Sequence, residues 1–242
     1  MRFLACISYD GSKFHGFQKL KKEKTIQGEL EKALTKINKS EVLVKGAGRT
    51  DRGVHAYNQI VHFELDIDID ETRLVAAINS IIDKNIYVKY CKVAPEEFHA
   101  RFNALEKTYE YVINMGEYNP LQTDYLYNYN RPLDIKAMKK AAKYLLGLNS
   151  YKAFVTGSNK TYMSVLYKIK IYKKKNHLYL RFVGKTFYNH MVRNLVGALM
   201  LVGKGKITPH QLKEMLIAEE NIYNYDTAPP EGLYLIEVKY DF

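Results

Sequence analysis

The order in which apolar patterns alternate along the chain constrains its fold more than any other feature of the sequence. In the N-terminal part, segments rich in β-branched and aromatic residues predict strands, and two segments with apolar residues at helical spacing predict helices. The helices are expected at Thr25–Lys39 and Glu71–Ile82. Strands are expected at Arg2–Tyr9, Glu41–Lys45, Asn58–Asp66 and Asn85–Val93. The predicted order is therefore strand, helix, strand, strand, helix, strand.

The C-terminal part repeats this order less regularly. Two βαββαβ units in tandem predict the α+β class, with two ferredoxin-like halves that share a mostly antiparallel sheet. The expected domains are residues 1–104 and residues 105–242. The helix Tyr188–Val202 is apolar nearly all round and should be buried. The other elements expected in this part are strands at Lys107–Asn114, Met163–Lys173, Leu178–Val183 and Leu233–Asp241, and helices at Ile135–Leu146 and Ile207–Ala218.

The charge and aromatic content of the chain indicate the kind of partner it has. There are 37 Lys and Arg residues against 26 Asp and Glu residues, a formal net charge of +11. Such an excess is typical of proteins that bind polyanions. The 21 Tyr residues, in a chain without Trp, add rings on which RNA bases could stack. The alternative is that Lys and Tyr both rise in proteins from AT-rich genomes, and composition alone does not decide between the two.

The cysteines and the apolar segments indicate a cytoplasmic protein. Cys6 and Cys91 lie far apart in predicted strands, so they form neither a metal site nor a disulfide framework, and we expect two buried thiols in a reducing compartment. The N-terminal sequence turns polar at Tyr9–Asp10, too early for a signal-peptide core. No apolar stretch approaches the roughly 20 residues that span a bilayer, so no membrane partner is expected.

A glycine-rich loop between two predicted strands, Gly46–Ala56, carries the most informative residues. It does not fit a dinucleotide fingerprint, because Asp51 stands where the third glycine is needed. It does not fit a P-loop either, because Val54 and His55 follow Gly53 in place of Lys and Ser or Thr. An acidic residue inside the loop would also repel phosphates. We therefore expect no nucleotide cofactor.

The same loop places a carboxylate between two guanidinium groups. Arg49 and Arg52 flank Asp51, and the glycines allow the backbone to turn sharply. We expect Asp51 to be an ionised base or nucleophile rather than an acid. The alternative is a loop aspartate that caps a turn and forms surface ion pairs with the arginines.

The loop sequence GRTDRGVHA, residues 48–56, closely resembles the signature loop of the TruA family of pseudouridine synthases. Further motifs resemble those of the family in the same order along nearly the whole chain, although Phe17 stands where the family usually has Trp. These motifs are Tyr9–Gly11 with Phe14–Gln18, Thr25–Glu29, Phe98–Phe102 with Tyr109–Tyr111, His190–Asn194 with Gly197, and Ala228–Pro229 with Glu231–Leu233.

The resemblance implies an activity and a set of partners. Members of the family isomerise uridine to pseudouridine in the anticodon arm of tRNA, usually at positions 38 to 40. They use neither a cofactor nor a metal, and they act as homodimers. The catalytic cleft is expected between the two ferredoxin-like halves. Cleavage of the base from C1′ builds positive charge on the sugar, which a nearby carboxylate can stabilise or trap.

The match also implies roles for individual residues. Asp51 corresponds to the catalytic carboxylate, and Arg193 to the arginine that pairs with it. Tyr109 corresponds to the tyrosine that lies against the target base and assists removal of the C5 proton. Arg49 corresponds to the residue that fills the gap left when the base is extruded. The alternative for Arg193 is a helix-surface charge, which the apolar helix around it argues against. Without the motif, Tyr109 would be an ordinary half-buried strand tyrosine.

Other basic residues are weaker candidates for substrate binding. Arg52 belongs to the catalytic loop, and His55 follows it as either a substrate contact or a satisfied loop histidine. Arg101, next to His99, would hold either a phosphate or the catalytic loop. Two runs of lysines would contact phosphates or form solvated faces. The first run includes Lys19, Lys21 and Lys22, and the second is Lys173–Lys175.

One region departs from the family pattern, and three alternative functions are considered. In Asn149–Leu166, Ser150 replaces the usual aspartate, and the usual cysteine and arginine are not recognisable, although Tyr151 and Phe154 would preserve packing. The departure favours, as an alternative, a paralogue with a shifted RNA site. A catalytically silent tRNA-binding module is a second alternative, but the intact Asp51 argues against it. An enzyme acting on free nucleosides would not need the basic charge.

Overall fold

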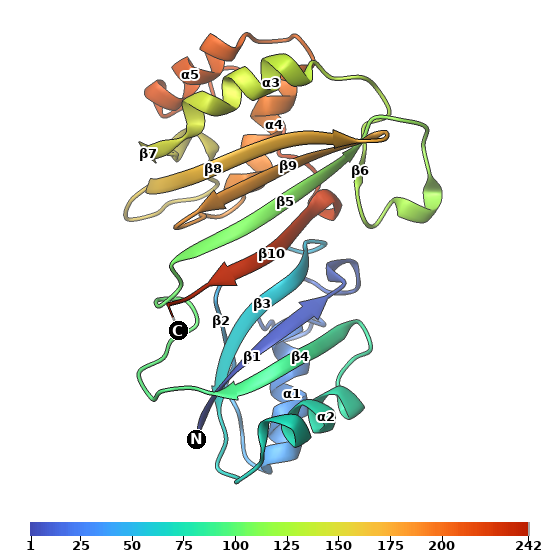
Figure 1. The fold of residues 1–242 in the computed structure, drawn as a ribbon, viewed down its shortest axis with the longest axis vertical. Helices are drawn as coiled ribbons and strands as arrows, with labels where there is room; N and C mark the ends of the chain where they lie inside the picture. Colours follow the sequence, from blue (N-terminus) through green and yellow to red (C-terminus); the bar gives the residue numbers. More distant parts are fainter. Residues whose placement is uncertain (242) are drawn as a thin grey trace. The chain divides into compact units, whose positions relative to one another are not determined.

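The computed structural model describes residues 1–241, and the chain divides into two compact units (Figure 1). Met1–Leu105 and the segment from Tyr234 onward form the first unit, and Glu106–Leu233 forms the second. The division into domains 1–104 and 105–242 stays a prediction, from which these units differ because the segment from Tyr234 onward belongs to the first unit.

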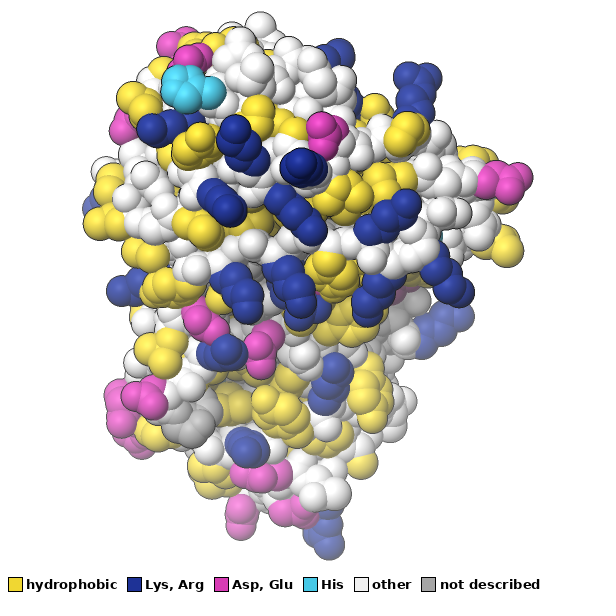
Figure 2. Space-filling model, turned by 45° about the horizontal axis from the view of Figure 1, so that its top comes forward, with side chains coloured by type: hydrophobic (Ala, Val, Ile, Leu, Met, Phe, Trp, Pro, Cys, Tyr) yellow, Lys and Arg dark blue, Asp and Glu magenta, His cyan; other side chains and the backbone are white. Residues whose placement is uncertain are grey.

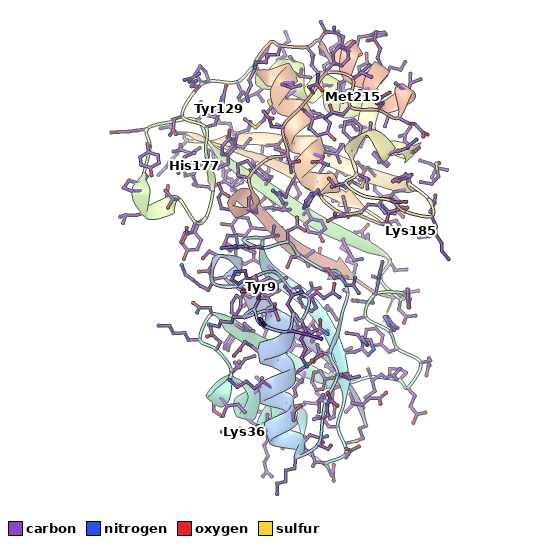
Figure 3. All side chains as sticks on the ribbon, turned by 180° about the vertical axis from the view of Figure 1, so that it is seen from behind. Tyr9, Lys36, Tyr129, His177, Lys185 and Met215 are labelled. Atoms are coloured by element: carbon purple, nitrogen blue, oxygen red, sulfur yellow. The ribbon has the colours of Figure 1, made fainter. Side chains whose placement is uncertain are left out.

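The first unit is built on strands β1 (Arg2–Tyr9), β3 (His55–Glu64), β4 (Ile86–Val93) and β10 (Leu233–Lys239). Their order is β4-β1-β3-β10, and β10 pairs with β3 in parallel while the others pair antiparallel. Helices α1 (Ile26–Asn38) and α2 (Glu71–Ile81) lie on one face of this sheet, as Figures 1 and 3 both show. A short 3-10 turn, Gly11–Lys13, follows β1.

Two predicted strands of this unit differ in the structure. The strand expected at Glu41–Lys45 is wrong, because only Lys45–Gly46 (β2) pairs with β3. Val42 and Val44 are buried, but their N–H groups donate to the side chains of Thr35 and Glu31 rather than to a strand. The strand expected from Asn58 begins earlier, at His55, because its first residues pair with β10.

The second unit is built on β5 (Glu106–Asn114), β9 (His177–Gly184), β8 (Met163–Lys174) and β7 (Gly147–Ser150), in the antiparallel order β5-β9-β8-β7. A short strand, β6 (Tyr127–Asn128), pairs with β5 in parallel. The helices are α3 (Ile135–Ala142), α4 (Met191–Gly203) and α5 (Pro209–Ala218). Short 3-10 turns lie at Pro120–Gln122, Lys143–Leu145, Lys152–Phe154 and Pro230–Gly232.

The two faces of this second sheet differ. Tyr111, Leu180 and Phe182 are fully buried on the face that carries the helices, while the side chains that alternate with them on β9 are half-buried on the other face. Helix α4 is buried along nearly its whole length, as predicted. It begins at Met191 rather than Tyr188, because His190 has a left-handed backbone with φ of 57°.

These observations confirm the α+β class and several packing predictions. Cys6 and Cys91 are both buried free thiols, and burial raises the pKa of Cys91 to about 12. Tyr151 and Phe154 are fully buried, so packing is kept in the region that departs from the family pattern. Among residues 1–241, no helix has the length and apolar character needed to cross a membrane.

Candidate active site

The loop between β2 and β3 is held by hydrogen bonds on both sides of Asp51. The Phe17 N–H donates to the Thr50 carbonyl oxygen at 3.0 Å, and the Val54 N–H donates to that of Asp51 at 3.2 Å. The Gln59 side chain donates to the Gly48 carbonyl oxygen at 3.0 Å. The backbone of the loop is therefore held by Phe17 and Gln59 from outside and by one bond within the loop. Asp51 itself is half-buried, and its two arginine neighbours are exposed.

A buried tyrosine anchors the residue before Asp51. The Tyr9 hydroxyl, at the end of β1, lies 2.8 Å from Thr50 Oγ1, and both side chains are buried. Figure 3 shows Tyr9 beside the end of α1 opposite to Lys36. Burial raises the pKa of Tyr9 to about 12, so its hydroxyl stays protonated and can donate. Tyr9 thus restrains the side chain of Thr50 and, through the backbone, Asp51.

Two glycines of the opening motif allow the chain to pass close to the loop. A Cβ on Gly11 would overlap the Val54 carbonyl oxygen. Gly16 has φ of 87°, and a Cβ there would lie 3.0 Å from the Thr50 carbonyl oxygen and 3.2 Å from the Arg52 nitrogen. Only glycine fits both requirements at Gly16, the positive φ and the close approach. The opening motif is therefore a support for the catalytic loop.

His55 is a buried histidine with several contacts rather than an exposed side chain. The Gly11 N–H donates to its Nδ1 at 3.1 Å, and its ring stacks on that of Tyr234 at 4.8 Å. The same Nδ1 also lies 3.3 Å from Asp10 Oδ1. The observed contacts connect the end of the catalytic loop to the opening motif and to β10.

The predicted basic residues of the opening region lie in an exposed segment before α1. Lys21 and Lys22 are exposed. The Lys19 ammonium lies 2.8 Å from the buried carboxylate of Glu31, and this hydrogen bond raises the pKa of Lys19. The segment begins directly after Phe17, whose N–H holds the catalytic loop. It therefore starts beside the loop that carries Asp51.

The structure does not bring Arg101 to the catalytic loop of the same unit. The neighbouring Ala100 N–H donates to His62 Nδ1 at 3.1 Å, near the far end of β3. His62 lies seven residues beyond His55, which is about 23 Å along an extended strand. Arg101 is exposed there beside Phe102 and His99. Both expected roles of Arg101, holding a phosphate or the catalytic loop, stay predictions, and its exposed position in this unit favours the first.

In the second unit, Tyr109 is placed by the pleat of β5. It is buried on the helix-bearing face, and its ring meets the ring of Phe187 edge-on at 5.0 Å. Tyr111 lies two residues further on the same face, and its hydroxyl donates to the Pro229 carbonyl oxygen at 2.6 Å. The two tyrosines therefore belong to one buried row.

Arg193 lies in the first turn of α4 and is oriented by the segment before β10. Its Nε donates to the Ala228 carbonyl oxygen at 2.8 Å, and the Ala228 N–H donates to the Arg193 carbonyl oxygen at 3.2 Å. The first bond restrains the guanidinium, and the second holds the segment against the start of α4. Because Ala228 precedes Pro229, the same short segment positions both Arg193 and Tyr111.

A polar cluster that the sequence did not single out supports this segment. Asn194 is buried and donates to the Phe154 carbonyl oxygen at 3.1 Å, while Thr227 Oγ1 donates to its Oδ1 at 2.7 Å. Asn194 belongs to a family motif, but nothing in its spacing identified Thr227 as its partner. Gln59 and Thr227 are supporting residues that sequence reasoning missed, and Tyr9 was identified only as part of the opening motif, without this role.

The chemistry available from these residues is acid–base and nucleophilic. The chain offers a half-buried carboxylate in a rigid loop, an oriented guanidinium and a buried phenol. Within residues 1–241, no cluster of three or more His, Cys, Asp or Glu residues has the geometry of a metal site.

Comparison with known proteins agrees with these features. A family model described as tRNA pseudouridine synthase matches residues 5–103 and 141–241. The chain is 39% identical over 244 residues to tRNA pseudouridine synthase A of Thermosipho melanesiensis, covering 98% of each chain. It is 36% identical over 245 residues to tRNA pseudouridine synthase A of Anoxybacillus flavithermus, covering 100% of each. A relative named tRNA pseudouridine synthase A from Paraburkholderia phytofirmans is 38% identical, over 97% of this chain and 88% of its own.

Proposed function

Because the chain belongs to the tRNA pseudouridine synthase family, we propose that it isomerises uridine to pseudouridine in the anticodon stem-loop of tRNA, at positions 38 to 40. The observation that carries this proposal is the GRTDRGVHA loop, in which Asp51 is held by backbone bonds on both sides. The net charge of +11 suits a polyanionic substrate.

In the proposed reaction, Asp51 acts at the ribose C1′ or C2′. The N1–C1′ bond breaks, and its electrons leave with the uracil. The carboxylate either bonds to C1′ or takes the proton from C2′. Both routes neutralise the positive charge that develops on the sugar. The uracil then turns and C5 bonds to C1′, as the carboxylate leaves C1′ in the first route or returns the proton to C2′ in the second. C5 then loses its proton, and N1 gains one. A rigid loop favours this chemistry because it keeps the carboxylate at a constant position.

Arg193 and Tyr109 complete the proposed catalytic set. The guanidinium of Arg193, oriented by Ala228, would pair with the carboxylate of Asp51 and keep it ionised when the substrate excludes water. Tyr109 would lie against the uracil and assist removal of the C5 proton. Arg49 would fill the gap left by the extruded nucleotide.

The remaining candidates would hold the RNA or the loop. Arg52, Lys21 and Lys22 are exposed and would contact phosphates, as would Lys19 through its half-exposed ammonium. The contacts of His55 favour a role in holding the loop rather than the substrate. We further propose that the enzyme works in the cytoplasm as a homodimer and without a cofactor. Sedimentation equilibrium tests the dimer, which should have twice the chain mass of 28.1 kDa.

The test of the activity is pseudouridine mapping on an unmodified tRNA transcript with uridine at positions 38, 39 and 40. We expect new pseudouridine at one or more of these positions. The Asp51→Asn variant should form none while it still binds tRNA, and Asp68→Asn, which changes an exposed carboxylate elsewhere in the first unit, should remain active. Substantial turnover by Asp51→Asn would refute the role of this residue. Salt-dependent tRNA binding without any product would favour the silent binding module.

A further inference from the structure

The helix-free face of the second unit's sheet carries a cluster of cationic and aromatic side chains. The register pairs Lys168 with Val183, Lys170 with Arg181, Tyr172 with Tyr179 and Lys174 with His177. Partners in a register point to the same face, so these side chains lie in adjacent rows across β8 and β9. We name Lys168, Lys170, Tyr172, Lys174, Tyr179 and Arg181 the basic sheet face. The three lysines are exposed, and the others are half-buried.

A hydrogen-bond network orders the centre of this face. The Glu110 carboxylate on β5 accepts from the Tyr172 hydroxyl and from Arg181 Nε, each at 2.8 Å. Tyr172 in turn stacks on Tyr179, with centroids 5.0 Å apart and planes at 9°. Glu110 is thus buried beneath longer side chains and engaged by Arg181. Its single negative charge is outnumbered by the four cations of the face.

The lysines are held over the tyrosine rings. Lys170 Nζ lies 5.2 Å from the centroid of Tyr172, and Lys174 Nζ lies 5.7 Å and 5.9 Å from those of Tyr172 and Tyr179. Cation–π contacts of this kind restrain the ammonium groups while leaving them in solvent. The predicted lysine run is divided by the pleat, because Lys173 pairs with Leu178 and Lys175 lies in the turn with φ of 50°.

The charges and ring contacts of the basic sheet face indicate which kind of partner it binds. Figure 2 shows many Lys and Arg side chains gathered on the surface, with few acidic side chains between them. A second copy of the same face would be repelled by its like charge. The tyrosine rings are stacked on each other and covered by ammonium groups, so they do not offer a platform for bases. Restrained Lys and Arg side chains, without an accessible aromatic ring beside them, favour binding of phosphates rather than bases.

We propose that the basic sheet face binds the phosphate backbone of the tRNA substrate at a place away from the target nucleotide. This inference rests on the proposed function, since tRNA is the polyanion it assumes. Tyr109, the proposed contact to the uracil, points to the helix-bearing face of β5, whereas Glu110 points to the opposite face. The RNA bound at the basic sheet face is therefore separated from the uracil by the thickness of the sheet.

The test compares two double variants that remove the same charge. Lys170→Gln/Lys174→Gln changes the basic sheet face, and Lys139→Gln/Lys140→Gln changes exposed lysines of α3. Dissociation constants are measured over a range of salt concentrations, for full-length unmodified tRNA and for the isolated anticodon stem-loop. Melting temperatures verify that each variant is folded, and Lys170→Arg/Lys174→Arg tests rescue by the retained charge.

For Lys170→Gln/Lys174→Gln we expect the affinity for full-length tRNA to fall about tenfold at low salt, with a salt slope reduced by about two. Affinity for the stem-loop should not change. The α3 variant should bind both RNAs as the unmutated protein does, and the arginine variant should restore tRNA binding. Unchanged tRNA affinity, or an equal loss for both RNAs, would overturn the inference. Failure of the unmutated protein to form pseudouridine would instead count against the proposed function.

Discussion

At the scale of single residues, the position of Asp51 depends on side chains outside its own motif. Tyr9 bonds the Thr50 hydroxyl, and Gln59 bonds the Gly48 carbonyl oxygen. Both side chains are buried, Tyr9 at the end of β1 and Gln59 in the middle of β3. The carboxylate is therefore connected to the core of the first unit through short, specific bonds.

Replacing Tyr9 by Phe should impair the loop without removing any catalytic group. The buried Thr50 hydroxyl would lose its partner, which costs about 1–2 kcal/mol of unfolding free energy. We also expect kcat to fall by about tenfold or more, because a small displacement of a catalytic group reduces its effectiveness. Urea unfolding and single-turnover assays would measure the two effects. Thr50→Ser, which keeps the hydroxyl, should retain most activity, and an equal loss in both variants would contradict this account.

His62 makes the stability of the first unit depend on pH. Burial, followed by the nearby charges of His99 and Arg2, lowers the pKa of His62 from 6.5 to about 4. Between these values the unfolded chain binds the proton and the folded protein does not, so stability falls as the pH drops from 6.5 towards 4.

We expect this loss to reach about 1–2 kcal/mol between pH 7 and pH 4.5, since partial access of water reduces the full linkage effect. Urea titrations across this range would measure it. In His62→Asn, whose side-chain oxygen can still accept the Ala100 N–H, the pH dependence in this window should become shallower. An unchanged slope would show that other groups cause it.

At the scale of elements, α4 depends on the segment that crosses it. A Cβ on Gly197 would overlap the Asp226 carbonyl oxygen, so the segment that ends in Ala228 passes directly against the helix. This close approach explains why a glycine is needed within a buried helix, where it otherwise lowers stability. It also connects the packing of α4 to the orientation of Arg193.

Gly197→Ala should therefore affect both stability and catalysis. The new methyl group would push the segment away and cost about 1–3 kcal/mol. It would also move the Ala228 carbonyl oxygen that orients Arg193, so kcat should fall while tRNA affinity changes little. Gly203→Ala is the matched control in the same helix, because its new Cβ would meet side-chain atoms of Met138 and Leu133. Equal effects of the two substitutions on kcat would disprove the connection between the packing at Gly197 and the orientation of Arg193.

At the scale of the whole molecule, the first unit is formed from two distant parts of the chain. Strand β10 pairs with β3 through Tyr234 and Leu235, whose partners are His55 and Ala56 directly after the catalytic loop. The unit therefore becomes complete only when the last strand is in place, although most of its residues come from the N-terminal part.

Leu235→Ala should test this arrangement. Leu235 is fully buried, and its truncation should cost about 2–5 kcal/mol. We expect hydrogen exchange to accelerate in β3 and β1, which belong to the same unit, more than in β8 and β9. Faster exchange confined to the second unit would contradict the division described here.

Local patterns in the sequence were enough to predict most helices and strands and the chemical motif. Apolar periodicity placed α1 and α2 close to their observed bounds, because one face of each helix is buried, and the β-branched and aromatic residues of β1 placed that strand. The motif identified Asp51, Tyr109 and Arg193 as candidates, since residue types and spacing persist within a family. Cap residues such as Thr25 and Asp70 act within one turn and are likewise local.

The contacts between distant residues became known from the folded structure. It replaced the strand expected at Glu41–Lys45 by a segment whose amides bond the side chains of Thr35 and Glu31. It assigned β10 to the first unit and placed Arg101 far from the catalytic loop within that unit. The physical reason is the same in each case. Periodicity records which face of an element is buried, but hydrogen bonds between side chains and remote backbone groups depend on contacts that no local pattern encodes.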